Sequence, residues 1–213
     1  TGAGLDFGTT NTVMALSENG TQSRSMQFSS MAGDTDSMRT ALSFMKDPSL
    51  GAAALHVEAG QAAIRQFIDH AGDCRFLQSI KTFAASSLFQ GTLIYAKRQT
   101  FEDLMEVFLR KLKTYAGDNW NGDIGTVVAG RPVRFAGSNP NEDLALQRYN
   151  EALTRMGFPN IHYVYEPVAA AYYFAQSLKK DANVLVADFG GGTTDYSLIR
   201  FETNGGQLSA KPI

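Results

Sequence analysis

Apolar and polar positions follow the same pattern in two segments that lie far apart in the chain. Residues 4–16 and residues 184–199 each contain an apolar run, then Asp-Phe-Gly, then glycine and threonine residues, then a second β-prone run. The residues from Val184 to Ala187 are continuously apolar, which is typical of a buried strand. Each segment therefore predicts a β-hairpin whose tight turn is made of glycine and threonine.

The chain between these segments contains helical and strand-like patterns. A helical period extends over 60–71, and an apolar stripe over 101–115 follows Thr100 and Asp103, which have capping-box spacing. Acidic residues after Asn141 begin a helix that ends before Gly157, and Pro167 opens a further helix that extends to Leu178. Short apolar runs at 124–129 and 161–165 predict strands.

Two larger patterns follow from this order of elements. Strand and helix alternate from residue 124 to 189, which predicts an α/β layer. The two Gly/Thr hairpins lie about 180 residues apart, which is too far for a solenoid and favours a duplicated, two-lobed protein. Residues 29–47 are polar and irregular, with Met31, Met38 and Met45 scattered among them, and predict a loop or the start of an insert.

The Gly/Thr turns are suited to phosphate. Glycine allows the backbone N–H groups to converge on a ligand, and threonine adds hydroxyl donors. Asp6 and Asp188 end their strands just before the turns and offer hard oxygen ligands to a Mg²⁺ ion that keeps most of its waters. A tight hairpin capped by an aspartate is the competing interpretation of one such turn, but its repetition favours a clamp that holds a polyphosphate from both sides.

Composition excludes several other classes of protein. The net charge of the 213 residues is −2, which offers no electrostatic footprint for nucleic acid or for an anionic membrane. No apolar stretch reaches membrane-spanning length, and no secretory signal is visible. Cys74 is the single cysteine, which excludes an internal disulfide framework and fits a reducing, cytoplasmic compartment. Neither Cys74 nor the three histidines have the spacing of zinc ligands. A Walker-type P-loop is absent.

The two hairpins resemble the phosphate loops of the actin-like ATPases, and most closely those of the DnaK-type, seventy-kilodalton heat-shock chaperones. Residues 6–11 (Asp-Phe-Gly-Thr-Thr-Asn) are similar to the first loop and residues 188–195 to the second. Residues 166–171 (Glu-Pro-Val-Ala-Ala-Ala) are similar to the helix that connects the two lobes. The fold implied is α/β, a ribonuclease-H-like lobe with a mixed β-sheet flanked by helices and a helical insert.

This resemblance also implies a domain organisation. Residues 1–33 and 118–185 correspond to the core of the first lobe, 34–117 to an insert subdomain, and 186–213 to the opening hairpin of the second lobe. The family's adenosine-binding loop is not in the sequence, so the 213 residues alone are expected to be inactive.

The resemblance implies ATP or ADP and Mg²⁺ as ligands, low ATPase turnover, and a role for each matching residue. Asp6 and Asp188 would hold Mg²⁺ through water, Glu166 would lie near the attacking water, and Lys81 would be the catalytic lysine reaching in from the insert. A solvated surface lysine is the competing interpretation of Lys81. The phosphate-binding positions are Gly8, Thr9, Thr10, Asn11, Gly190, Gly191, Gly192, Thr193, Thr194 and Asp195.

Two other functions remain open. Asn11 stands where DnaK-type chaperones have an aromatic residue, and asparagine there is a feature of bacterial actin relatives of the filament-forming MreB type. A sugar or acetate kinase of the same superfamily would need an acceptor site that no residue here identifies. For a chaperone, nucleotide is the expected partner, with unfolded clients and co-chaperones binding through C-terminal regions.

Overall fold

A mixed β-sheet forms the centre of the computed structural model, which describes residues 1–20, 22–120, 122–190 and 194–213. The strand order is β11-β10-β1-β2-β3, with β4 also paired to β2. β1 is antiparallel to β2 and parallel to β10, and β10 is parallel to β11. The bounds are β1 Gly2–Phe7, β2 Asn11–Ser17, β3 Ser23–Ser25, β4 Met38–Arg39, β10 Thr126–Arg131 and β11 Asn160–Tyr165.

Helices α2 (Phe101–Ala116) and α3 (Glu142–Arg155) bury the apolar side of this sheet. Side chains alternate along β1, so that its odd-numbered residues from Ala3 to Phe7 face the core while the even-numbered ones lie on the other face. Phe7 makes edge contacts with the aromatic rings of Phe101, Phe108 and Tyr149. The expected mixed sheet flanked by helices is confirmed.

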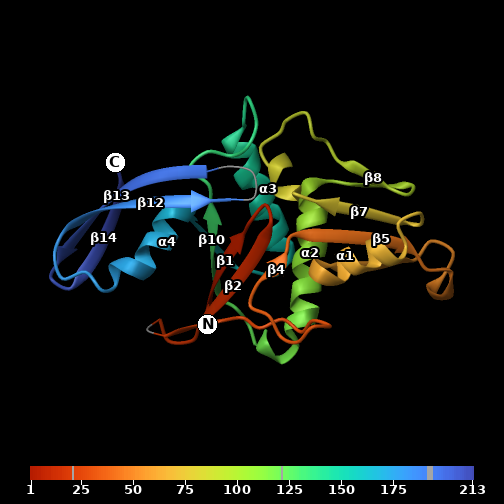
Figure 1. Cartoon of the computed structure of the whole chain (residues 1–213), viewed down its shortest axis with the longest axis horizontal. Helices are drawn as coiled ribbons and strands as arrows, with labels where there is room; N and C mark the ends of the chain where they lie inside the picture. Colours follow the sequence, from red (N-terminus) through yellow and green to blue (C-terminus); the bar gives the residue numbers. More distant parts are fainter. Residues whose placement is uncertain (21, 121, 191–193) are drawn as a thin grey trace.

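An insert lies on one side of the central sheet, as Figure 1 shows. It contains helix α1 (Gly60–Asp69), and its strands pair antiparallel in the order β6-β5-β7. The remaining bounds are β5 Ala41–Lys46, β6 Leu55–Ala59, β7 Cys74–Gln78, β8 Thr92–Ile94 and β9 Lys97–Gln99, with short 3-10 helices at Pro48–Leu50, Ile80–Phe83 and Gly117–Asn119. This small sheet adds to the helical insert that the resemblance implied.

The expectation of an irregular segment over 29–47 is wrong for its second half. Strand β5 is the middle strand of the insert's sheet, and residues 41–44 are all buried. Both faces of β5 are therefore covered, so its sequence lacks the alternation that would reveal a strand. Even Ser43 is buried, and its hydroxyl donates a 2.5 Å hydrogen bond to Gln66 of α1.

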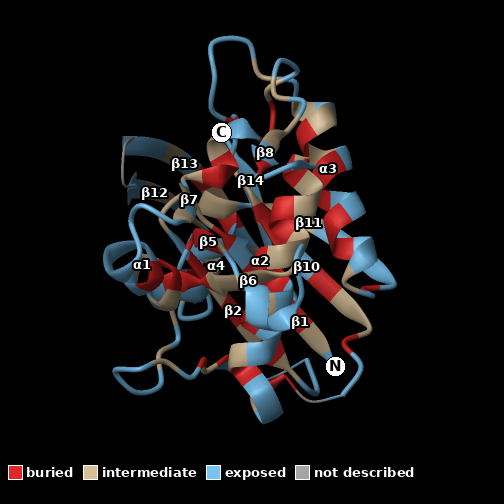
Figure 2. Ribbon diagram, turned by 90° about the vertical axis from the view of Figure 1, so that its right-hand side faces the viewer, coloured by how far each residue is buried: buried red, intermediate tan, exposed pale blue. Residues whose placement is uncertain are grey.

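On the other side of the central sheet, α4 (Glu166–Ala175) packs against a second sheet with the order β12-β13-β14. Its strands are β12 Ala182–Phe189, β13 Thr194–Asn204 and β14 Gln207–Pro212. This part has its own hydrophobic cluster, distinct from the main core: Val168, Ala171, Ala175, Ile199 and Phe201. Figure 2 shows that burial is concentrated in the central body, while β12–β14 are largely exposed.

Both predicted hairpins are present as antiparallel strand pairs, β1–β2 and β12–β13. The helices predicted over 60–71, 101–115, 141–156 and 167–178 are confirmed as α1 to α4, with ends within a few residues. The predicted domain boundaries stay predictions. Within the described residues, no helix combines the length and the apolar character needed to cross a membrane.

Candidate functional site

An ion pair joins the insert to the start of α4. Lys81 lies in the 3-10 helix Ile80–Phe83, and its Nζ is 2.5 Å from Oε1 of Glu166. The Lys81 side chain is only 9% exposed and that of Glu166 only 20%. Lys81 is therefore not a solvated surface lysine, although its catalytic role stays a prediction. Residues 85 positions apart in the chain meet here.

The absence of a side chain at Gly130 leaves space for the side chain of Glu166. Gly130 lies in β10, and a Cβ atom at this position would sit 3.1 Å from Cγ of Glu166. Glu166 is the first residue of α4, directly before Pro167, whose missing N–H costs nothing in the first helical turn. The carboxylate is thereby held at the edge where β10 ends.

Two aspartates extend the charged group. Solvent reaches the Asp6 side chain, yet the surrounding protein desolvates it and raises its pKa; Lys81 opposes this shift and Asp188 adds to it. Burial also raises the pKa of Glu166, with Lys81 acting against the shift and both aspartates reinforcing it. The charges of Lys81 and Asp188 thus act on both Asp6 and Glu166, although four separate segments supply these residues.

The first Gly/Thr turn is tightly built. The N–H of Gly8 donates to the carbonyl of Asn11 at 3.0 Å, and a Cβ atom on Gly8 would lie 2.2 Å from that same oxygen. Thr9 and Thr10 form the turn between β1 and β2, and Asn11 is the exposed first residue of β2. Only glycine fits at position 8 without a shift in the backbone.

Thr40 supports this turn, although the sequence does not single it out. Its N–H donates to the carbonyl of Thr10 at 2.8 Å, and its hydroxyl lies 2.8 Å from the hydroxyl of Thr12 in a buried pair. Thr40 falls within the segment that was expected to be irregular. No pattern in the sequence indicates that residue 40 returns to the first hairpin.

The second hairpin places its acidic residues opposite one another. Asp188 of β12 pairs in register with Asp195 of β13, and Phe189 pairs with Thr194. In the first hairpin, Val13 stands opposite Asp6. Gly190 follows β12 directly. The predicted phosphate-binding residues Gly191, Gly192 and Thr193 lie outside the described residues.

The donor set at Asp6 and Asp188 suits a hydrated magnesium ion. Both groups are carboxylates at the ends of strands, and the negative charge of Asp188 contributes to the raised pKa of Asp6. Mg²⁺ in nucleotide sites is commonly held by one or two carboxylates while it keeps several waters. Among the residues that the structure describes, no three carboxylate, imidazole or thiol groups gather as direct metal ligands.

An ion pair beside Glu166 likewise has no signal in the sequence. Arg131 at the end of β10 donates to Oε2 of Glu142 at 2.6 Å, and its guanidinium lies 5.2 Å from the ring centroid of Tyr165. The hydroxyl of Tyr149 is fully buried and has no hydrogen-bond partner in the part of the chain described. Both features come from side-chain packing that spacing alone does not reveal.

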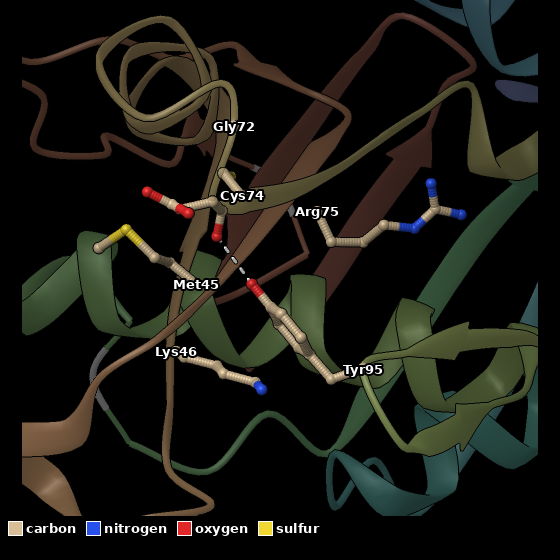
Figure 3. Close-up of a pocket in the computed structure, with 7 residues that line it drawn as sticks. Met45, Lys46, Gly72, Cys74, Arg75 and Tyr95 are labelled. Atoms are coloured by element: carbon tan, nitrogen blue, oxygen red, sulfur yellow. Dashed lines mark hydrogen bonds between the residues drawn. The ribbon is translucent and has the colours of Figure 1, made fainter.

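Two hollows lie apart from these charged residues. One, of about 540 Å³, is on the insert; in Figure 3 Tyr95 points across it, and its hydroxyl donates to the carbonyl of Asp73 at 2.9 Å. The other, of about 640 Å³, lies between the 29–35 segment and α1. Neither contains a residue that was predicted for the nucleotide site.

Comparison with known proteins decides the family. The sequence model described as "Hsp70 protein" matches residues 77–211, more than half of the chain. The chain belongs to the Hsp70 family. This Hsp70 chain is 29% identical over 201 residues to the chaperone protein DnaK of Thermosipho africanus, a match that covers 92% of the chain and 30% of the relative.

A second relative leads to the same family. The chaperone protein HscA homolog of Rickettsia typhi is 26% identical over 208 residues, covering 93% of this Hsp70 chain and 33% of the relative. The chain therefore spans about a third of the length of these relatives. The resemblance to a divergent member of the DnaK type is confirmed.

Proposed function

We propose that this Hsp70 chain forms the first lobe, and the beginning of the second, of a Mg-ATP-binding and ATP-hydrolysing domain in a DnaK-like chaperone. The observation that carries the proposal is the charged group formed by Asp6, Lys81, Glu166 and Asp188. Asp6 and Asp188 precede the two Gly/Thr turns, and Glu166 begins the connecting helix α4. The fourth is a buried lysine from the insert.

Each side chain has a distinct task in this proposal. The backbone of the Gly8 turn, with Thr9 and Thr10, offers donors to phosphate oxygens. Magnesium, when bound beside Asp6 and Asp188, would neutralise charge on the polyphosphate. Lys81 would stabilise the negative charge that develops on the transferred phosphoryl group.

In this proposal, Glu166 would orient the attacking water. Burial raises the pKa of its carboxyl, and the positive charge of Lys81 partly opposes that rise. A carboxylate with a raised pKa is a better proton acceptor than a solvated one, which suits a weak general base. Its hydrogen bond with Lys81 fixes the direction in which the carboxylate points.

ATP turnover by the complete protein, with and without Mg²⁺, tests the proposal. Asp188→Asn is expected to lower Mg-dependent turnover by about a hundredfold or more, since it removes a charge from the metal site. Asp181→Asn, just before the same strand, is the matched control, because the carboxylate of Asp181 accepts from the N–H of Thr203, away from the turn. Equal turnover in the wild type and in Asp188→Asn would refute the proposal.

A filament-forming ATPase is the second candidate, and Asn11 is the observation that favours it. This residue is exposed at the start of β2, where chaperones of the DnaK type carry an aromatic side chain. Sedimentation of the complete protein separates the two functions. ATP-dependent pelleting would support the filament, and a protein that stays in the supernatant with ATP supports the chaperone.

Partners belong to the same proposal. We expect unfolded-protein clients and co-chaperones to bind through regions beyond residue 213, since the relatives named as chaperones are about three times as long as the matched segment. A cytoplasmic location is expected with them. Fractionation of the native host's cells, followed by pull-down with the complete protein, tests both expectations.

A further inference from the structure

One buried arginine binds a whole loop of the insert. Arg148 of α3 is 8% exposed, and its Nη1 donates to the carbonyls of Phe83, Ala84 and Ser86 at 3.0, 2.9 and 3.0 Å. Its Nη2 donates to the carbonyl of Phe89 at 2.7 Å. A single guanidinium thus satisfies four backbone acceptors in one stretch of seven residues.

This arrangement is unusual for a buried cation. Burial lowers the pKa of the Arg148 guanidinium, and the charge of Glu102 only partly opposes the shift. No carboxylate within the described ranges forms an ion pair with Arg148, so the backbone carbonyls compensate for the lost hydration. The planar fork of arginine suits several fixed acceptors, whereas a lysine ammonium is a compact point charge.

The bound loop continues directly from the helix that carries Lys81. The 3-10 helix Ile80–Phe83 is a single turn, too short to hold its own position, and the N–H of Ala84 donates to the carbonyl of Lys81 at 3.1 Å. Asn141, the N-cap residue of α3, adds a second attachment through its N–H to the carbonyl of Ala85 at 2.9 Å. The backbone around Lys81 is therefore tied to α3.

Helix α3 is also linked to the segment that carries Glu166, the acidic partner of Lys81. Glu142 in the first turn of α3 binds Arg131 at 2.6 Å and accepts the N–H of Phe135 at 3.0 Å. Arg131 lies over the ring of Tyr165, the residue before Glu166. Helix α3 thus reaches Lys81 through Arg148 and reaches Glu166 through Glu142.

We infer that Arg148 is a positioning residue for Lys81: by binding the 83–89 loop to α3, it keeps the lysine ammonium against Glu166 and the phosphate turns. This inference rests on the proposed function for its catalytic consequence. Its structural part, that Arg148 determines where the Lys81 side chain lies, stands on the geometry alone. The two parts therefore need separate readouts.

The structural readout is acylation of lysine by acetic anhydride, followed by mass spectrometry of the complete protein. Lys81 is buried and paired, so it should react slowly, and Arg148→Lys should increase its rate by about tenfold as the loop loosens. Lys97, exposed on β9, is the internal reference and should be unaffected. The matched control is Arg155→Lys, since Arg155 lies on the same helix and pairs with Asp103 and Glu151.

The catalytic readout is ATP turnover by the same variants. Arg148→Lys is expected to lower kcat by about tenfold to a hundredfold with little change in KM, because the misplaced group acts on the transferring phosphoryl rather than on binding. In a Lys81→Ala background, Arg148→Lys should lower kcat no further. Arg155→Lys should leave kcat within about twofold of the wild type.

The outcomes separate the inference from the proposed function. If the wild type hydrolyses no ATP, the proposed function fails, while acylation still decides whether Arg148 positions Lys81. Unchanged acylation of Lys81 in Arg148→Lys overturns the inference. So does an equal loss of kcat with and without Lys81, because that loss would reflect general destabilisation. Should circular dichroism show that Arg148→Lys is unfolded, Arg148→Gln provides the same comparison.

Discussion

Gly8 is the residue at which local geometry is most demanding. Its Cβ-free backbone allows the carbonyl of Asn11 to approach to within 2.2 Å of where a Cβ would be. Gly8→Ala is expected to destabilise the fold by about 1–3 kcal/mol and to weaken nucleotide binding, because the turn must open to accept the methyl group. Urea unfolding and nucleotide titration of the complete protein measure both effects.

Gly4 provides the control for that substitution. It lies two residues before Asp6 on the same strand, and a Cβ atom there would meet nothing within 4 Å. Gly4→Ala should therefore be neutral or slightly stabilising. If both variants lose the same stability, strand propensity rather than the close approach at Gly8 explains the result.

The carboxyl of Asp6 predicts a particular dependence of stability on pH. Since its pKa is raised in the folded protein, the contribution of Asp6 to stability is full below its unfolded pKa of about 4 and is lost as pH rises through the folded pKa. Asp6→Asn removes that loss. Without divalent cations, its melting temperature should therefore exceed that of the wild type increasingly as pH rises towards neutrality.

Thermal melts of Asp6→Asn and of the wild type, from about pH 4 to pH 8 in the presence of a chelator, check this sign. Asp118→Asn, which alters an exposed carboxylate in the turn after α2, serves as a control and should follow the wild type at every pH. A difference for Asp6→Asn that shrinks as pH rises would contradict the assignment of burial as the main cause.

Some residues of the site can be recognised from a short stretch of sequence, and others cannot. Asp6 and Asp188 stand in short motifs where strand, turn and acid occur together, so the sequence alone brings them to attention. Arg148 and Thr40 act through carbonyls that are distant in the chain. Their partners are backbone atoms, which carry no sequence signal, so only the folded structure reveals them.

Among the helices, α2 has the clearest sequence signal for its start. The Thr100 hydroxyl accepts the N–H of Asp103 at 3.2 Å, and the Asp103 carboxylate accepts the N–H of Thr100 at 2.8 Å. Thr100→Ala should therefore cost about 1 kcal/mol of stability. Chemical denaturation measures it, and a loss below about 0.3 kcal/mol would show that tertiary packing alone holds this helix end.

The same helix offers its own control. Thr114 lies near the C-terminal end of α2, is exposed, and donates its hydroxyl to the carbonyl of Arg110 at 3.1 Å. Thr114→Ala should change stability by less than about 0.5 kcal/mol, since the carbonyl already belongs to the helical ladder. The contrast isolates the cap from the general effect of removing a threonine.

Elements with caps were predictable from the sequence, and elements defined by burial on both faces were not. Thr100 and Asn141 are N-cap residues, and each side chain accepts the backbone N–H three residues further on, which marks the start of its helix. Strand β5 has no such signal, because its partners β6 and β7 follow it in the chain and helix α1 covers it. The residues that bury and pair β5 extend as far as residue 78, so no short stretch of sequence around β5 indicates a strand.

Across the part of the chain that the structure describes, the buried apolar residues form two separate hydrophobic clusters. Phe201 is fully buried in the smaller one, where Tyr172 meets it edge-on at 5.8 Å. Phe201→Ala is expected to cost about 3–5 kcal/mol locally. Hydrogen exchange should then quicken in α4 and β12–β14, while amides of β1, β2 and β10 keep their protection.

Leu109→Ala in the larger cluster is the counterpart of that variant. Leu109 is fully buried in α2, and its truncation should speed exchange in the central sheet. If Phe201→Ala speeds exchange in both clusters equally, the chain unfolds as one cooperative unit. That result would contradict the division into two clusters.

The repeated hairpin was predictable because β1–β2 and β12–β13 share the same short sequence pattern. The way in which the chain between the two hairpins connects them was not predictable. Helix α4 packs mainly on β12–β14 while its first residue, Glu166, pairs with Lys81. The sequence shows only a helix of strongly apolar character between two strands. Which sheet that helix covers depends on contacts that form across the whole chain.

The proximity of Asp188 to Asp6 has a consequence for proton exchange with the solvent. Because the charge of Asp188 raises the pKa of both Asp6 and Glu166, an arrangement with the second hairpin close binds more protons than one with it withdrawn. Without a cation, and in the pH range where these two carboxyls titrate, bringing this hairpin close would take up protons, so acid would favour the close arrangement. A divalent cation held beside Asp6 and Asp188 would favour their ionised forms, so that with the cation present the same approach would release protons.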